Sequence, residues 1–333
     1  MALRIPGAFR TKTLSLVNRS RISRTMQNSG IADKQCIVFI FTEQLMHFAP
    51  FCIPETNGQF EVMLLLNGVS DNSTRWLTSL FQETSIVRLK ASLTGNAKSL
   101  LSHAAVLNDL LAVIRRPFVI QDPDCFVTDP RFFDEVHVAE DEFAAGPFVK
   151  QPTDHNHILP DTFFLMLNSP LFHRLSREFG ISAELITSLP TKAMKAAQTF
   201  GYQPGQFTEN FKNYFDTLQA YWIVAQAEGK RFRLLEGSGK TVFHIGGTSY
   251  LHKCNYDLSH WDYWPLSVQY FNLRLLEQPV NARFRIQFSS LFSTYADADD
   301  LLKKYPGFKD GYRYRDAQAI LDACVYRRAS PGV

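Results

Sequence analysis

The sequence predicts an α/β fold with a mostly parallel sheet flanked by helices, followed by a helical C-terminal part. Two observations lead to this prediction. Short apolar runs alternate with segments whose apolar residues recur every three or four positions, which is the order of strands and helices in parallel sheets. The chain has 333 residues, of which 45% are hydrophobic, so it is long and apolar enough to bury a core of this kind.

The first half of the chain carries the alternation most clearly. Its elements are the strand 36–41, the strand 60–66, the helix 74–82, the strand 85–89, the helix 97–114 and the strand 118–120. Pro117 ends the second helix, because proline cannot continue a helix. Parallel sheets bind ligands at the carboxyl ends of their strands, so the polar residues that follow these strands are the first candidates for a site.

The second half is less regular. Its expected elements are the strand 163–167, the helices 170–179 and 208–229, the strands 231–235 and 241–245, and the helix 312–326. These elements predict three parts: a flexible basic arm over residues 1–34, one catalytic domain over residues 35–265, and a helical extension over residues 266–333.

Charge and cysteine content exclude several classes of protein. A net charge of +3 is too small to predict nucleic-acid binding, and no apolar run is long enough to span a membrane. The basic excess lies in residues 1–32, which contain no acid; a targeting segment, a surface for anionic lipid and a tail without a role stay open. Five cysteines without a CxxC pair predict reduced thiols in a cytoplasmic protein, not a zinc site.

The strongest local motif is Asp122-Pro123-Asp124, directly after an expected strand. Two carboxylates one residue apart at a strand end can face the same cleft, and hard divalent cations prefer oxygen ligands. The motif therefore predicts a site for Mn²⁺ or Mg²⁺ beside a diphosphate. The alternative is an Asx-Pro turn that only ends the strand.

Two further polar turns follow expected strands. Asn67 and Asp71 lie in a glycine turn that opens a helix, where side-chain oxygens could hold a ribose or base, or where Asp71 or Ser73 could simply cap the helix. His244 precedes two glycines and two hydroxyl residues, which suits a metal or phosphate neighbour. The alternative for His244 is an ordinary histidine beside a turn.

Taken together, the motifs resemble those of the inverting glycosyltransferases with the type A fold, a Rossmann-like architecture, and most closely over the block from Cys36 to Val136. The motifs that carry the resemblance are Asn67-Gly68-Val69-Ser70-Asp71, Asn96 and Asn108, Asp122-Pro123-Asp124, Tyr214-Phe215-Asp216, and His244-Ile245-Gly246-Gly247-Thr248-Ser249. The resemblance implies transfer of a sugar from a nucleotide-diphosphate-sugar to a saccharide or other hydroxyl acceptor, with inversion. It also implies a role in surface polysaccharide synthesis, in the cytoplasm or at the inner membrane.

The resemblance also implies a role for individual residues. Asp216 would be the general base that activates the acceptor hydroxyl. Asp124 and His244 would hold the metal. The expected donor contacts are Thr42, Asn67, Asp71, Asn96 and Asp122. The implied partners are a nucleotide-sugar and a saccharide, without nucleic acid, and with peripheral membrane contact through the basic arm.

Two positions depart from the family pattern. Leu66 stands where an acid is usual before the Asn-Gly turn, and Phe215 stands where a second acid usually precedes the base. Glu209 is the nearest rival for the base. These departures keep a catalytically silent nucleotide-binding protein as one alternative. A sugar nucleotidyltransferase is the other, although the first strand lacks the glycine-rich basic loop that such enzymes use.

Overall fold

The computed structural model describes residues 7–54, 56, 58–92, 100–149, 158–203, 215–235, 241–246 and 264–326, with side chains from residue 12 onward. The chain divides into two compact units, each built from several segments. The sheet unit comprises Met1–Glu43, Asn57–Asp122 and Phe133–Glu236, and the helical unit comprises Gln44–Thr56, Pro123–Phe132 and Gly237–Val333.

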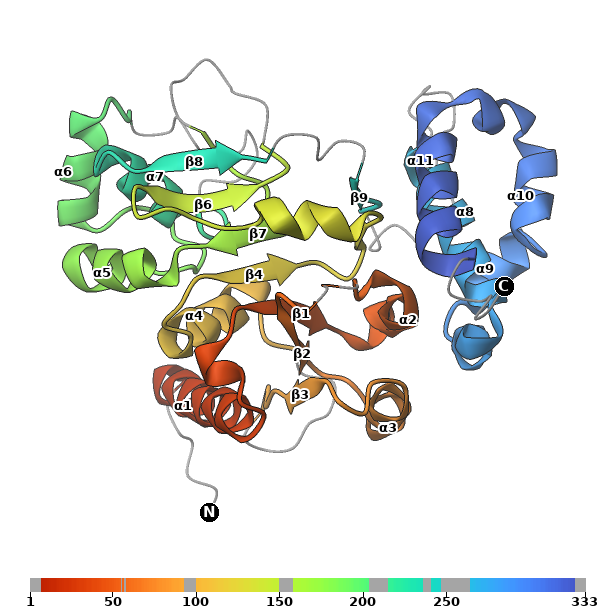
Figure 1. The fold of residues 1–333 in the computed structure, drawn as a ribbon, viewed down its shortest axis with the longest axis horizontal. Coiled ribbons are helices and arrows are strands. Elements are labelled where there is room, and N and C mark those ends of the chain that lie inside the picture. The colour runs from red at the N-terminus through yellow and green to blue at the C-terminus, as the bar shows by residue number, and fades with distance from the viewer. Residues whose placement is uncertain are drawn as a thin grey trace. The chain divides into compact units, whose positions relative to one another are not determined.

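The sheet unit contains a seven-stranded sheet in the order β3-β2-β1-β4-β7-β6-β8, which Figure 1 shows as neighbouring arrows. The strands are β1 (Cys36–Phe41), β2 (Glu61–Leu66), β3 (Ser85–Arg88), β4 (Phe118–Gln121), β6 (Glu142–Gly146), β7 (Phe164–Leu167) and β8 (Arg231–Leu234). Every neighbouring pair is parallel except β4 with β7 and β6 with β7, so β7 alone runs against the others. The predicted mostly parallel α/β sheet is confirmed.

Helices surround this sheet and complete its core. They are α1 (Gly7–Asn28), α3 (Asp71–Leu80), α4 (His103–Val113), α5 (Ser169–Phe179), α6 (Thr191–Thr199) and α7 (Gln219–Ala227). Helix α1 packs on α4 and β3, α4 packs on α5, and α7 packs on α5 and α6. Their apolar sides and the strands form one buried cluster that includes Val38, Leu65, Leu107, Ile120 and Trp222.

The segment expected to be a flexible arm is instead helical over Gly7–Asn28. Its buried residues Asn18, Ile22 and Met26 recur every four positions, so they form one stripe facing the core. The Asn18 amide donates to the Lys90 carbonyl (3.1 Å) and accepts from the Lys90 N–H (2.7 Å). The abundance of arginine and serine concealed this stripe, because the stripe holds only two large apolar residues.

Two strands were not expected from the sequence, β6 and β5 (Cys125–Val127). The β6 residues, Glu-Phe-Ala-Ala-Gly, have low strand propensity, and the segment is extended because it is buried between β7 and β8. A Cβ atom on Gly146 would lie 2.7 Å from the Phe164 carbonyl oxygen, so only glycine permits this close packing.

The helical unit contains α2 (Ala49–Cys52), α8 (Trp264–Glu277), α9 (Ser289–Thr294), α10 (Ala298–Lys304) and α11 (Tyr312–Ile320), and a two-stranded sheet of β5 and β9 (Val242–His244). Its core is aromatic: the ring centroids of Phe48 and Phe126 are 6.1 Å apart, and those of Phe126 and Phe271 are 5.1 Å apart. The predicted helical C-terminal part is confirmed.

Two expectations from composition can be compared with the structure. Within the described part of the chain, no helix is both long and apolar enough to cross a bilayer. Cys36, Cys52, Cys125 and Cys324 are buried free thiols, and Cys254 lies outside the described residues.

Candidate active site

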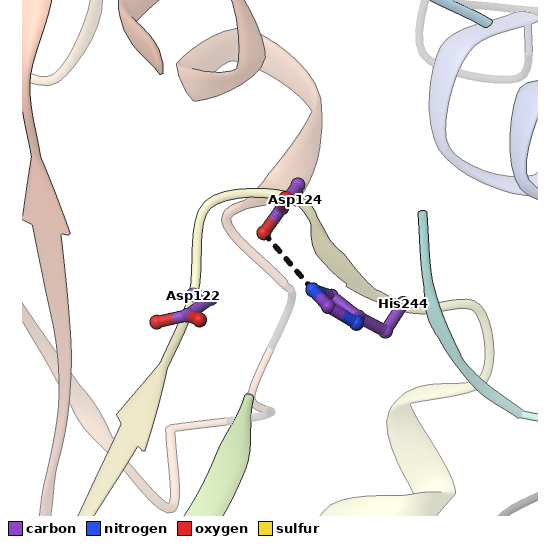
Figure 2. Close-up of side chains that lie close together, drawn as sticks. All are labelled: Asp122, Asp124 and His244. Carbon is purple, nitrogen blue, oxygen red and sulfur yellow. Dashed lines mark ion pairs between the residues drawn. The ribbon is translucent and has the colours of Figure 1, made fainter. Parts of the chain in front are cut away.

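Three potential metal ligands gather where β4 ends. Asp122, Asp124 and His244 each offer one ligating atom, and these three atoms lie within 4.8 Å of one another (Figure 2). We call these three side chains the metal group. The Asp124 and His244 side chains are 10% and 18% exposed, and His244 Nε2 lies 3.4 Å from Asp124 Oδ1. Asp122 ends the segment Asn57–Asp122 of the sheet unit and is joined to Asp124 through Pro123, so the two residues are close along the chain.

The backbone holds these side chains in place. The Asp122 N–H donates to the carbonyl of Phe163 (2.8 Å), the residue before β7. The Asp124 carbonyl accepts from the Ile245 N–H (3.0 Å), and Cys125 pairs with His244 across the β5–β9 ladder. Gly246 has a φ of 63°, and a Cβ there would lie 2.9 Å from His244 Cε1. Glycine at this position therefore leaves room for the imidazole ring.

The donor set suits a hard or borderline divalent cation. Two carboxylates and one imidazole match Mn²⁺ or Mg²⁺, whose remaining coordination positions are commonly filled by water and substrate phosphate. A histidine 120 positions farther along the chain joins Asp122 and Asp124 in this group, and the role of the motif as a metal site stays a prediction.

Asn67 lies at the end of β2 and is only 3% exposed. Its side-chain amide donates to the Leu101 carbonyl (2.8 Å) and accepts from the Leu101 N–H (2.9 Å). The residue therefore anchors the segment that enters α4, which begins two residues later at His103. A contact between Asn67 and a donor stays a prediction beside this structural role.

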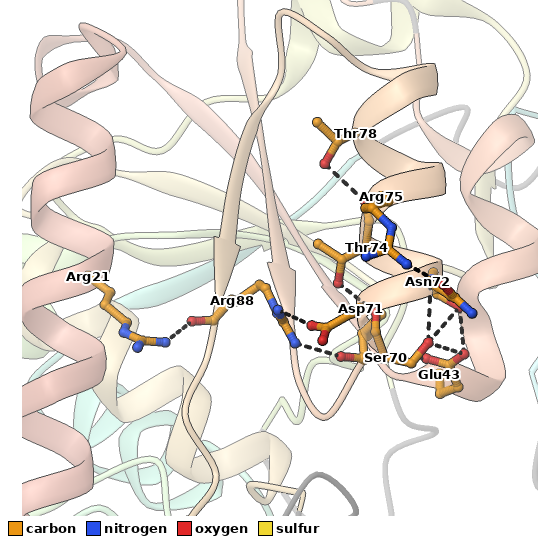
Figure 3. A network of polar contacts seen from close by, with 11 residues as sticks. Arg21, Glu43, Ser70, Asp71, Asn72, Thr74, Arg75, Thr78 and Arg88 are labelled. Atoms are coloured by element: carbon orange, nitrogen blue, oxygen red, sulfur yellow. Dashed lines mark hydrogen bonds and ion pairs between the residues drawn. The ribbon is translucent and has the colours of Figure 1, made fainter. Parts of the chain in front are cut away.

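The turn that opens α3 is capped differently from the expectation. Ser70 is the N-cap, and its Oγ accepts from the Ser73 N–H (3.2 Å). Asp71 is instead an exposed residue whose carboxylate lies 2.5 Å from Arg88 Nη1 (Figure 3). The expected contact of Asp71 with the donor base or ribose is not tested by this geometry.

Glu43 is a residue of this turn that the site prediction missed. Its carboxylate accepts from the Ser70 N–H (2.7 Å) and from Ser73 Oγ (2.6 Å), so an acid from the end of β1 stabilises the start of α3 (Figure 3). Thr42, its neighbour, is half-buried directly after β1. The signal for Glu43 was its position beside Thr42 at a strand end.

Asp216 lies beside a cavity of about 190 Å³ in the sheet unit. His103, Thr162 and Trp222 also line this cavity. Burial lowers the pKa of His103 below its usual value, and the charge of Asp216 offsets part of that effect. His103 was not predicted, because it lies inside the expected helix 97–114; the structure instead begins α4 at His103. Asn96 and Glu209 lie outside the described residues.

Comparison with known families gives one match, to part of the chain. Residues 18–172 match the model of the StrH glycosyltransferase N-terminal domain. This match indicates a glycosyltransferase. It covers all of β1 to β7, with the Asp122–Asp124 turn, and ends before Asp216 and His244. The match agrees with the enzyme class expected from the sequence, and no curated protein matches the chain.

Solved structures of glycosyltransferases resemble the chain only distantly. The glycosyltransferase GlyE of Streptococcus pneumoniae is 12% identical over 62% of this chain and 46% of its own, with a TM-score of 0.35. An active-site mutant of LgtC is 12% identical over 68% of this chain and 80% of its own, with a TM-score of 0.39. Mouse xyloside xylosyltransferase 1 is 8% identical over 61% of this chain and 85% of its own, with a TM-score of 0.38. This chain thus spans less than half of GlyE, and likeness at this level carries no inference about the reaction.

Proposed function

We propose that this glycosyltransferase uses a nucleotide-diphosphate-sugar and a divalent cation, and that the cation is Mn²⁺ or Mg²⁺ held by Asp124 and His244 with Asp122 beside them. The observation that supports this proposal is the group of three ligating atoms within 4.8 Å of one another at the end of β4. When bound, such a cation neutralises the negative charge that develops on the leaving diphosphate.

The residues around the metal group have separate tasks in this proposal. Asp124 and His244 bind the cation, and Asp122 orients the donor at the carboxyl end of β4, where parallel sheets bind ligands. Thr42, Asn67, Asp71 and Asn96 are the proposed contacts to the nucleoside part of the donor. Asn67 would act there through the backbone of Leu101, which its amide holds.

Asp216 is the proposed general base, and its surroundings support that assignment. Its carboxylate Oδ1 accepts from the Thr217 N–H (2.7 Å), and its own N–H donates to Gln219 Oε1 (2.7 Å). The first bond holds the carboxylate, and the second holds the backbone of Asp216, beside the cavity. A base that removes the proton of an acceptor hydroxyl in one displacement inverts the anomeric centre, which NMR of the product tests directly.

A thermal-shift screen of UDP, GDP, dTDP and CMP, each with and without Mn²⁺, tests the donor and metal sites. A ligand that binds only the folded state stabilises it by about 2.7 kcal/mol at a hundredfold excess over its dissociation constant. We expect a Mn²⁺-dependent rise in Tm with one nucleoside diphosphate. A flat response to every nucleotide, with and without Mn²⁺, would contradict the proposal.

A silent nucleotide-binding protein is the second candidate, and one observation favours it. Leu66 is buried at 1% exposure where the family usually has an acid. Nucleotide binding without release of sugar or of nucleoside diphosphate from any donor would support this second function. A role in surface polysaccharide synthesis and contact with a membrane rest on the family resemblance and stay predictions.

A further inference from the structure

Two arginines and a histidine come together in the sheet unit, near the amino end of β4. Arg115 follows the C-cap of α4, and its Nη1 lies 2.6 Å from Nδ1 and 2.8 Å from Nε2 of His173, which belongs to α5. Arg177 lies four residues after His173, so the two side chains project from the same face of α5. We call Arg115, His173 and Arg177 the basic cluster.

The acid next to the basic cluster in the sequence has other partners. Glu178 follows Arg177 directly. Its carboxylate lies 3.3 Å from the Arg174 guanidinium and 3.0 Å from the Lys192 ammonium. Within the described ranges of the chain, no acidic side chain forms an ion pair with Arg115 or Arg177. The two guanidinium groups therefore share a histidine as their neighbour instead of a carboxylate.

The histidine in the middle of the cluster lies in the positive field of both arginines. Burial lowers the pKa of His173, and the charges of Arg115 and Arg177 lower it further. A backbone hydrogen bond at Ile114 offsets part of this effect on the pKa. His173 is half-buried and both arginines are exposed, so an anion from solvent can reach the guanidinium groups.

Helix dipoles account for each arginine separately but not for their convergence. Arg115 follows the end of α4, and Arg177 lies in the last turn of α5, two positions where a cation is favourable. Neither dipole requires Arg115 to contact a second basic side chain. The two helices pack on each other, and the Ser169 hydroxyl at the start of α5 donates to the Ile114 carbonyl at the end of α4 (2.5 Å). Rigid elements thus bring the three basic groups together.

The basic cluster is separate from the proposed active site. Arg115 precedes β4 and Asp122 follows it, and the four residues of this strand span about 13 Å. No residue of the cluster is among the described residues that line the cavity at Asp216. An anion held by the basic cluster is therefore not the diphosphate of a donor bound at the metal group.

We propose that the basic cluster is a second ligand site, which binds a phosphate group through the guanidinium groups of Arg115 and Arg177 beside His173. Guanidinium groups recognise phosphate because their N–H donors form short, charge-assisted hydrogen bonds to its oxygens. The phosphate group belongs either to a soluble compound or to the headgroup of an anionic lipid, and the chemistry of recognition is the same for both. This inference goes beyond the proposed function and does not depend on it.

The ring signals of His173 report on binding at this site directly. Inorganic phosphate is titrated into the full chain at constant ionic strength with EDTA present, and the histidine rings are followed by NMR, with His173→Gln to assign the signals. We expect the His173 signals to shift and saturate with a dissociation constant of about 1 mM or tighter. Sulfate should raise the pKa of His173, because a bound anion offsets the two positive charges. His173 signals that respond to neither anion would overturn the proposal.

Charge-removing variants test the two arginines. Arg115→Gln and Arg177→Gln should each weaken phosphate binding about tenfold, since each removes one charged donor. The matched control is Lys195→Gln, which removes an exposed charge from α6 in the same unit and should bind phosphate as wild type does. Equal losses in the control and in both arginine variants would assign binding to net charge and overturn the proposal. A Tm within a few degrees of wild type confirms that each variant is folded.

Vesicles separate the two sources of the phosphate group. Sedimentation of the full chain with phosphatidylglycerol vesicles is compared with sedimentation with phosphatidylcholine vesicles. Binding to the anionic vesicles that Arg115→Gln loses and Lys195→Gln keeps would assign the site to a lipid headgroup. Binding of inorganic phosphate without binding to vesicles would assign it to a soluble compound. Absence of both kinds of binding would overturn the proposal, and would leave the proposed reaction at the metal group untouched.

Discussion

The metal group and the cavity at Asp216 differ in charge and in construction. The metal group places two carboxylates and an imidazole within 4.8 Å, a concentration of acidic ligands that favours a cation. The described lining of the cavity has one carboxylate, a histidine whose pKa is lowered by burial, and apolar side chains. A sugar transfer needs both environments: one to stabilise a leaving diphosphate and one to activate a hydroxyl.

Loss of the metal group should have the largest effect on activity. Asp124→Asn removes a charged ligand from a site that stabilises several kcal/mol of developing charge, so we expect transfer to fall about a thousandfold or more. The Mn²⁺-dependent rise in Tm should disappear as well. Asp310→Asn, an exposed acid of the same helical unit, is the matched control. Wild-type turnover by Asp124→Asn would contradict the proposed metal site.

Loss of the base should slow the chemical step without disturbing the metal group. Asp216→Asn is expected to lower kcat about a hundredfold or more, the usual contribution of a general base. The Mn²⁺-dependent affinity for the nucleoside diphosphate should stay within about twofold of wild type, because Asp216 is assigned to the acceptor. Steady-state kinetics check the fall in kcat, and nucleotide titrations with Mn²⁺ check the unchanged affinity. Full activity of this variant would place the base elsewhere.

A third variant tests whether Asn67, which follows β2, holds the segment that leads to His103 and the cavity. Asn67→Ala removes both bonds to Leu101 and should cost about 2 to 3 kcal/mol of the free energy of unfolding, measured by urea denaturation. The entry to α4 would then loosen, so the KM for acceptor should rise while the affinity for Mn²⁺ stays unchanged. An unchanged urea midpoint would mean that Asn67 does not hold this segment.

Two histidines with lowered pKa values give the smallest expected effect, a dependence of stability on pH. Burial lowers the pKa of His47 from 6.5 to about 4, and it also lowers that of His103. The unfolded chain therefore binds protons below pH 6.5 that the folded chain does not, so stability falls as the pH drops from 6.5 toward 4. His47 alone should cost about 2 kcal/mol between pH 7 and pH 5.

Replacement of His47 checks the assignment of this pH effect. His47 Nε2 lies 2.5 Å from Asn272 Oδ1 in the core of the helical unit, so His47→Gln keeps a polar side chain of similar reach. We expect the variant to lose most of the fall in stability between pH 7 and pH 5, measured by urea unfolding at each pH without added metal. An unchanged pH dependence would assign the effect to other groups.

The sequence predicted the two regions unequally, for physical reasons. The parallel strands, with their apolar runs, and the Asp122-Pro123-Asp124 turn are local patterns, so both could be predicted from neighbouring residues. The cavity is assembled from segments around residues 103, 160 and 216, and no local pattern shows that these meet. Strand β6 is extended through tertiary burial in spite of its composition. Helix α1 was missed because its buried stripe includes Asn18, a polar residue whose partner lies on another segment.

Titration of Mn²⁺ by electron paramagnetic resonance, with the nucleoside diphosphate chosen by the thermal screen, tests the central claim most directly. The free-ion signal should fall as wild-type protein and nucleotide are added together, and it should stay at its free-ion amplitude with Asp124→Asn or His244→Ala. If both variants bind Mn²⁺ and the nucleotide as tightly as wild type, the group at the end of β4 is not the metal site.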